Sequence, residues 1–324
     1  MAKVTNAFDT YTATADREQL SDVIYNISPQ QTPFMSSIGK NSIKNVVFDW
    51  QEESLPTPSG TGQLEGFELS RAASTATTRV SNVAMISSRD ATVTGSQQAS
   101  DPAGKKSEMA HQLAIMSKAL KRDMETALCQ NGAKTTGNAT TARKTGGFES
   151  WIKSNYSKAA AGAPTGGGTA PTDGTQRALT ETLLKAVLQS CFTNGGEPSM
   201  AICGPVNKQK ISAFTGRASA RQVIDANTVE ASVSIYASDF GELKIVPSNF
   251  SRERTLLLVD PDFAKVSYLR DFKTVDISTI GDAQTKMLVV EYGLEVSIRK
   301  IFLQTPKKRL HGVVVAEPME RWVI

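Results

Sequence analysis

The sequence predicts an α+β fold that carries one very long helix and a long two-stranded arm. Three patterns indicate this class. Apolar residues recur at three- and four-residue steps over residues 101–130, which is typical of a long amphipathic helix. A helix–strand–helix pattern covers residues 179–214 and implies a layer of mixed α and β structure. Five apolar residues alternate with polar ones from Val290 to Arg299, which favours a half-buried strand.

The composition allows a sizeable hydrophobic core and excludes several classes of protein. The chain has 324 residues, which at about 150 residues per domain permits roughly two domains. Hydrophobic residues make up 40% of the chain and charged residues 21%, so wholesale disorder is excluded. The formal net charge of +4 is too mild for a dedicated nucleic-acid binder.

The lack of a targeting signal and the cysteine usage together predict a cytosolic compartment. The N-terminal stretch lacks the apolar region of a signal peptide, and no apolar run approaches the ~18 residues that span a bilayer. The three cysteines, Cys129, Cys191 and Cys203, are an odd number without close spacing, so we expect reduced thiols. Cys129 and Cys191 occupy apolar positions of helix patterns and are expected to be small buried hydrophobes.

No arrangement of residues predicts an enzyme. The sequence has no phosphate-binding loop, nucleophile elbow or His-Glu-x-x-His motif. Gly60, Gly62 and Gly66 approach a dinucleotide fingerprint, but their spacing is wrong and no helical pattern follows. The histidines, His111 and His311, are more often packing or surface residues than catalytic bases in such contexts. We therefore expect no catalytic, cofactor-binding or metal-ligating residue.

Residues 1–44 are expected to form an N-terminal arm. Asp16 and Gln19 have capping-box spacing and begin a short helix that ends at Ser28–Pro29. The apolar stripe of this helix consists of Leu20, Val23, Ile24 and Ile27. Thr32–Pro33 then predicts a further helical turn, which Gly39 ends.

Residues 45–98 are expected to form an extended two-stranded arm. Asn45–Gln51 is β-branched and aromatic, and a turn-rich excursion with several Pro and Gly residues follows. Arg79–Ile86 and Asp90–Gly95 return as strand-like segments. A lone hairpin is marginally stable in water, so this arm should need a partner surface.

The charges suggest which surface that is. Five acids and no basic residue lie between Asn45 and Ser70. They are Asp49, Glu52, Glu53, Glu65 and Glu68. The segment Arg299–His311 has five basic residues and no acid, namely Arg299, Lys300, Lys307, Lys308 and Arg309. These are either two solvated faces, or inter-subunit contacts in which the acidic arm of one subunit lies on the basic surface of the next.

The longest helix is expected within residues 99–132. Asp101–Pro102 offers an N-cap with a proline at the first helical position, and Gly132 offers a stop. About 28 residues would span roughly 42 Å. The helix should therefore cross the molecule.

The rest of the chain divides by composition into a loop-rich connection, an α/β unit and a final sheet segment. Residues 133–177 are rich in Gly, Thr and Ala, with one anchored element around Phe148–Ile152. Residues 178–275 combine two helices with strands expected near 199–203, 235–236, 243–246, 255–259 and 265–269. Residues 276–324 contain the alternating strand.

Element order and two local stretches carry a resemblance to a known family. Arg17–Lys40 (REQLSDVIYNISPQQTPFMSSIGK) and Gly146–Asn155 (GGFESWIKSN) are similar to one branch of the major capsid proteins of tailed bacteriophages. The resemblance implies the Hong Kong 97-type fold. In that fold residues 45–98 would be the extended loop, 99–132 the spine helix of the peripheral domain, 178–275 the axial domain, and 276–324 the strands completing the peripheral domain.

The resemblance also implies a function in the virion. The chain would self-assemble, in the bacterial host cytoplasm, into pentamers and hexamers of an icosahedral shell around double-stranded DNA. Its partners would be copies of itself, the packaged DNA through non-specific contacts, and scaffold, portal and decoration proteins, with no membrane. The alternatives are a tail-tube or decoration protein, or a soluble DNA-binding protein that uses the basic run at 299–309. An enzyme ranks below these.

Overall fold

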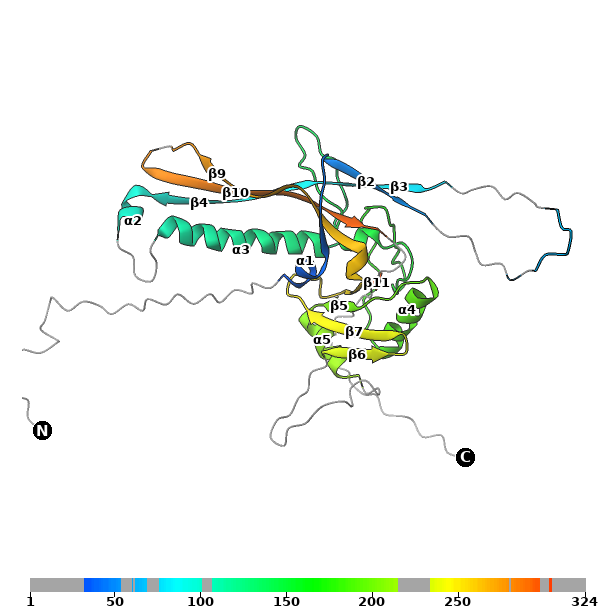
Figure 1. The fold of residues 1–324 in the computed structure, drawn as a ribbon. Coiled ribbons are helices and arrows are strands. Elements are labelled where there is room, and N and C mark those ends of the chain that lie inside the picture. The colour runs from blue at the N-terminus through cyan, green and yellow to red at the C-terminus, as the bar shows by residue number, and fades with distance from the viewer. Residues whose placement is uncertain are drawn as a thin grey trace, which may run out of the picture.

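A computed structural model describes residues 32–53, 60, 62–68, 76–100, 107–214, 234–279 and 281–297, and the backbone of 303–304. The strands form a four-stranded sheet, a five-stranded sheet and a two-stranded hairpin, and one long helix lies along the four-stranded sheet (Figure 1). The chain is thus of mixed α and β structure, as the sequence predicts. The helix expected at Asp16–Ile27 lies outside the described residues.

The first sheet has four strands in the order β1-β9-β10-β4. These are β1 (Gly39–Ser42), β4 (Met85–Thr94), β9 (Ala264–Ile277) and β10 (Ala283–Val296). β10 pairs antiparallel with both β4 and β9, and β1 adds to β9 in parallel. The alternating segment that predicts a strand therefore lies at the centre of this sheet.

Helix α3 (Glu108–Cys129) lies along one face of this sheet (Figure 1). It begins later than the sequence predicts, because its N-cap is Ser107, whose hydroxyl accepts a hydrogen bond from the Ala110 N–H at 3.4 Å. The N-cap of α3 is therefore Ser107 and not the expected Asp101, which lies outside the described residues, and a short helix α2 (Gly95–Ala99) precedes α3. At 22 residues α3 is about 33 Å long. Its predicted stripe is confirmed at Leu120, Met124 and Leu128, which are fully buried.

The opposite face of the sheet is also covered near the centre of β10. The alternation predicts that Glu291, Gly293 and Glu295 face water, and this is wrong for the first two. Glu291 is buried and pairs with Arg143 and Arg270, while Phe48 of the hairpin lies against Gly293. A segment distant in the sequence therefore covers a face whose polar residues suggest exposure.

The second sheet has five strands in the order β11-β8-β5-β7-β6. They are β5 (Met200–Cys203), β6 (Ile235–Ser238), β7 (Gly241–Pro247), β8 (Leu256–Val259) and β11 (Leu303–Gln304). Helices α4 (Glu181–Thr193) and α5 (Pro205–Ser212) belong to the same part of the chain. In β5, Ala201 and Cys203 pack with the buried residues of α4, while Met200 and Ile202 join the core of the first sheet.

Two strands lie in other sheets than the sequence order suggests. The strand expected at Lys265–Leu269 is longer, Ala264–Ile277, and belongs to the four-stranded sheet rather than to the unit with strands 200–259. Conversely, β11 at 303–304 pairs with β8 in the five-stranded sheet. Between β8 and β9 the chain passes through the 3₁₀ turn η3 (Pro261–Phe263).

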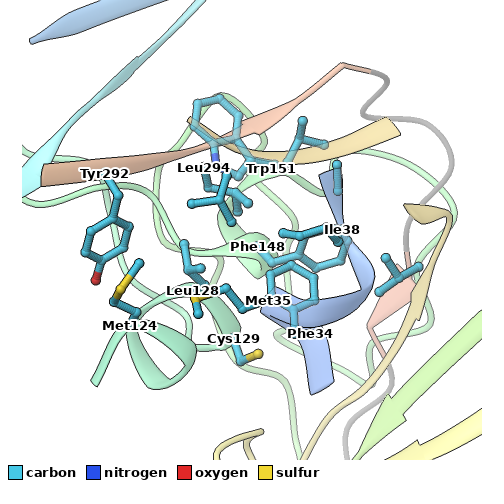
Figure 2. Packing of buried hydrophobic residues seen from close by; sticks show 14 of the residues in the cluster. Phe34, Met35, Ile38, Met124, Leu128, Cys129, Phe148, Trp151, Tyr292 and Leu294 are labelled. Atoms are coloured by element: carbon cyan, nitrogen blue, oxygen red, sulfur yellow. The ribbon is translucent and has the colours of Figure 1, made fainter. Parts of the chain in front are cut away.

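One hydrophobic cluster joins the first sheet, α3 and the short helix α1 (Pro33–Ser37). Figure 2 shows Phe34 and Met35 of α1 beside Leu128 and Cys129 of α3, with Phe148 and Trp151 from the 3₁₀ turn η1 (Phe148–Trp151). Phe34 and Phe148 meet edge to face, with ring centroids 5.3 Å apart. This packing confirms the helical turn predicted at Thr32–Pro33 and the anchored element predicted around Phe148.

Candidate assembly surfaces

The hairpin arm is formed by β2 (Val47–Glu52) and β3 (Thr78–Val83), which pair antiparallel. Figure 1 shows it projecting beyond the end of the four-stranded sheet, with residues 62–68 well away from the body. The segment Asp90–Gly95, which the sequence predicts as part of the arm, is not part of it, because it overlaps β4 and β4 lies in the four-stranded sheet. A β-branched, alternating composition fits either position, so sequence alone does not separate the two.

The described part of the arm's tip exposes two large apolar side chains. Leu64 is 84% exposed and Phe67 is 50% exposed. They flank a tight turn in which the Phe67 N–H donates to the Leu64 carbonyl at 3.1 Å, and Gly66 has a φ of 78°. A positive φ of this kind is unstrained for glycine. The sequence analysis does not predict this pair, and its only sequence signal is Leu-Glu-Gly-Phe within a polar stretch.

The predicted acidic contacts are distributed along this arm. Glu52 lies at the end of β2 and is half-buried, and Glu53 beside it is exposed. Glu65 and Glu68 are exposed at the tip, next to the apolar pair. Asp49 differs from them, because the Arg79 Nε on the opposite strand donates to its Oδ2 at 3.0 Å. The basic residues Arg299, Lys300, Lys307, Lys308 and Arg309 lie outside the described residues.

Asn82 fixes the root of the arm to the body. Its side-chain amide donates to the Leu294 carbonyl of β10 at 2.6 Å and to the Thr145 hydroxyl at 3.0 Å. Its Oδ1 accepts from the N–H groups of Val83 and Gly146 at 2.8 and 3.1 Å. One buried side chain thus joins β3, β10 and the loop before η1. Buried polar groups need such partners, so the position of the root is well determined.

Aromatic packing supports the same root. The ring centroids of Trp50 in β2 and Trp151 in η1 are 5.3 Å apart, and those of Phe48 and Trp50 are 6.0 Å apart. The Lys134 ammonium donates to the Ser81 carbonyl at 2.7 Å and lies over the Trp151 ring. The arm therefore leaves the body in a direction set by packed side chains on both of its strands.

Ion pairs around the buried Glu149 hold the long connection against the five-stranded sheet. The Arg252 guanidinium donates to the Glu149 carboxylate at 2.6 Å and also binds Asp173, with which Arg254 forms an ion pair at 3.0 Å. Burial raises the pKa of Glu149, and the Arg252 charge opposes that rise. These four side chains tie residues 149 and 173 to the segment that enters β8.

The N-terminal helix α1 is held by a buried carboxylate on α3. Glu125 accepts hydrogen bonds from the backbone N–H groups of Phe34 and Met35, at 2.8 and 2.9 Å. Its side chain is fully buried, and burial raises the pKa of this carboxyl. A glutamate in the apolar part of α3 gives no sequence signal for this contact, because its partners are backbone groups 90 residues away.

The cysteines, candidate metal ligands and helix lengths give no further functional site within the described residues. Cys129, Cys191 and Cys203 are buried and form no disulfide, and burial raises the pKa of Cys191 to about 12 and that of Cys203 to about 11. Within the described ranges, three or more His, Cys, Asp or Glu side chains nowhere gather as metal ligands would. None of the described helices is both long and apolar enough to cross a bilayer.

Solved structures with the same architecture define the class of the fold. A capsid structure of cyanophage A-1(L) matches with a TM-score of 0.65 and 14% identity, covering 93% of this chain and 99% of that one. The capsid of a native GTA particle matches at 0.63 and 12%, over 94% and 100% of the two chains. A structure from Microbacterium phage Oxtober96 matches at 0.62 and 11%, over 90% and 96%. The chain therefore has the Hong Kong 97-type fold of phage capsid proteins, as the resemblance predicts.

Sequence comparison gives the family. The family model of the SU10 major capsid protein matches residues 3–302, so the chain belongs to the SU10 major capsid protein family. The major capsid protein of Escherichia phage Phieco32 is 30% identical over 129 residues. That match covers 40% of this chain and 37% of the relative, so it spans little more than a third of that protein's length. The assignment favours a capsid subunit over a tail-tube, decoration or DNA-binding protein.

Proposed function

We propose that this major capsid protein builds the icosahedral head shell of a tailed phage, as pentamers and hexamers around double-stranded DNA. Assembly in the host cytoplasm, followed by residence in the virion, belongs to the same proposal. The observation that carries it is the hairpin arm, which is anchored firmly at its root while its described tip exposes Leu64 and Phe67. Exposed apolar side chains rimmed by polar residues are typical of a surface that another molecule covers.

Copies of the same chain are the natural covering surface. A contact between the arm of one subunit and the body of the next is heterologous, and heterologous contacts close into rings when the rotation permits. The acids at the tip, Glu65 and Glu68, would then meet positive charge on the neighbour. The basic run with Lys307, Lys308 and Arg309 is the proposed counterpart, together with Arg299 and Lys300 earlier in the sequence. Opposite charges of this kind set the register of a contact more than its strength.

A charge-swap experiment tests this contact. Glu65→Lys with Glu68→Lys should block ring and shell formation at low salt, and so should Lys307→Glu with Lys308→Glu, as seen by negative-stain microscopy and sedimentation. The combined quadruple variant should restore assembly, because the pairing is re-established with its signs exchanged. Each single-side variant is the matched control for the other.

Two outcomes would contradict the proposal at different levels. Assembly that is unchanged by either charge reversal, at low and at high salt, would remove the acidic–basic contact but leave the shell function. Particles of uniform monomer mass in every condition, including those of the unmodified chain, would count against the shell function itself.

A further inference from the structure

A groove of about 940 Å³ lies between the N-terminal segment, α3 and β9. Met35, Tyr268, Leu269 and Phe272 contribute its apolar lining. Its size is at the upper end of the 300–1,000 Å³ typical of ligand pockets, so it can take several aliphatic side chains. Apolar groups displace water favourably from these four side chains, and the other eight lining residues are polar or charged.

The charges around the groove have one predominant sign. Lys40 on β1 and Lys121 on α3 both line it, against the single acid Asp271. The Lys121 ammonium lies over the Phe272 ring, 5.9 Å from its centroid. An occupant with an apolar face and acidic flanks would complement this arrangement.

The chain itself enters the structure at the rim of this groove. Thr32 is one of the lining residues, and the following helix α1 is fixed by Glu125 and by the burial of Phe34. Thirty-one residues precede Thr32. The segment nearest to it with an apolar stripe is Asp16–Ile27, and residues 28–31 between them reach at most about 14 Å.

The composition of Asp16–Ile27 matches the groove. Its stripe of Leu20, Val23, Ile24 and Ile27 is aliphatic, and the segment has three acids, Asp16, Glu18 and Asp22, against Arg17 alone. A tether of four residues keeps such a segment at an effective concentration in the millimolar range. A weak intrinsic affinity is then sufficient for occupancy.

We propose that the groove between α1, α3 and β9 is the docking site of the chain's own Asp16–Ile27 segment. The aliphatic stripe lies on Met35, Tyr268 and Phe272, and the acids face Lys40 and Lys121. The occupant is intramolecular, so the contact forms in a free subunit and does not depend on the proposed shell.

Cysteine cross-linking in the full-length chain tests the contact. Ser21→Cys, next to the stripe, is combined with Ser117→Cys or Ser42→Cys on the groove wall, and a short bismaleimide is added. The native cysteines are buried and compete poorly for the reagent. The matched control combines Ser21→Cys with Lys118→Cys, which is on α3 but not on the groove wall. We expect clear cross-linking to the wall positions and little to the control.

Isotope mixing tells the chain's own segment from that of a second copy. When ¹⁴N- and ¹⁵N-labelled chains are unfolded and refolded together, cross-linked peptides should carry a single isotope. Peptides of mixed isotope would overturn the proposal and assign the groove to another subunit. Yields at both wall positions no higher than at Lys118→Cys would overturn it altogether.

Matched substitutions check the chemistry of docking. Ile24→Glu should lower the cross-linking yield by about tenfold or more, because it removes an aliphatic side chain from the apolar lining. Asn26→Glu adds the same charge off the stripe and should leave the yield unchanged. Lys121→Glu should weaken docking, whereas Lys118→Glu should not. Equal effects within either pair would contradict the proposed contact.

Discussion

At the residue scale, the buried carboxylate of Glu125 shows how one side chain can position a distant segment. It accepts from two backbone N–H groups of α1, and no described cation pairs with it. A carboxylate without a positive partner in an apolar setting is costly to keep ionised. The raised pKa of Glu125 follows from this burial, against the opposing effect of the two hydrogen bonds.

The first prediction concerns the pH dependence at Glu125. Because the pKa of its carboxyl is raised above 4.5 on folding, the folded chain binds this proton more tightly than the unfolded chain. Its contribution to stability is therefore full below 4.5 and is lost as the pH rises through the raised value. The free energy of unfolding of Glu125→Gln, relative to the unmodified chain, should rise over that interval. Denaturant titrations at several pH values measure this.

Met124→Leu is the control for this prediction, because it changes a buried side chain next to Glu125 on α3 without removing a titratable group. Its difference from the unmodified chain should not vary with pH. A Glu125→Gln difference that is equally flat would show that the Glu125 carboxyl does not change its proton binding on folding.

The second prediction concerns Gly293, which the hairpin root covers. A Cβ at this position would lie 2.5 and 2.7 Å from two ring carbons of Phe48. Gly293→Ala should therefore lower the free energy of unfolding by about 1–3 kcal/mol through overpacking. Gly62→Ala is the control, since its Cβ would have no atom within 4 Å. Phe48→Leu in the same chain should recover part of the loss, and a failure to do so would place the strain elsewhere.

Residue patterns predicted the apolar contacts well and the buried charges poorly. The stripe of α3 and the turn at Phe34 follow from spacing alone, because a helical period brings those side chains to one face. Glu125, Glu149 and Glu291 could not be predicted as buried, since their partners are distant in the chain. Nothing local distinguishes such a glutamate from a solvated one.

At the element scale, the root of the hairpin arm depends on Asn82 more than on the two strands themselves. The strands pair over six residues each, and their outer ends are largely exposed. The amide of Asn82 supplies four hydrogen bonds that join three segments.

The third prediction is that Asn82→Ala weakens this root. Its partners would be left buried without a hydrogen bond, and each such group costs about 1–3 kcal/mol. We expect the free energy of unfolding to fall by at least about 2 kcal/mol, and amide exchange to accelerate at Val83 and Gly146. Asn249→Ala, at an exposed asparagine between β7 and β8, is the control and should change little. Unchanged exchange at Val83 would refute the role of Asn82.

Most elements were predicted in type but less well at their ends. The helices and strands of residues 179–259 appear where periodicity places them. The start of α3 was misplaced because Asp101–Pro102 and Ser107–Glu108 are both good helix starts, and α3 begins at the latter. The two-stranded arm was overestimated, because β4 has the same alternating composition as β3 and only its pairing with β10 assigns it.

At the scale of the whole molecule, a buried ion-pair network and a shared core connect the two sheets. The core cluster includes Ile202 and Val259 of the five-stranded sheet together with Leu128 and Tyr292 around the four-stranded one. Arg252 adds polar links from the segment before β8 to Glu149 and Asp173. The sheets therefore belong to one packed body.

The fourth prediction is that this body depends on Arg252. Arg252→Met leaves the fully buried Glu149 carboxylate without its guanidinium partner, and breaking such a pair typically costs about 3–5 kcal/mol. Adding Glu149→Leu should restore part of that stability, because the buried charge is then removed as well. Calorimetry of the two variants measures both effects. A double variant less stable than Arg252→Met alone would contradict this account.

The order of elements along the chain was sufficient to predict the fold class and the family resemblance, but not the membership of each strand. Strand pairing joins residues far apart, so β9 and β11 could be assigned only from the structure. The candidate contacts were predicted by charge alone. The exposed pair at Leu64 and Phe67 was missed because two apolar residues in a turn-rich stretch fit no periodic pattern.

The three-residue turn η3 between β8 and β9 has a mechanical consequence. A link this short transmits tilt between the sheets instead of absorbing it, and the common core stiffens it further. In the proposed shell, a subunit at positions of unequal curvature would therefore deform little at its centre. The hairpin arm would then adjust its conformation instead. The contacts between neighbouring copies, more than the core of each copy, should therefore differ between the five-fold and six-fold positions of that shell.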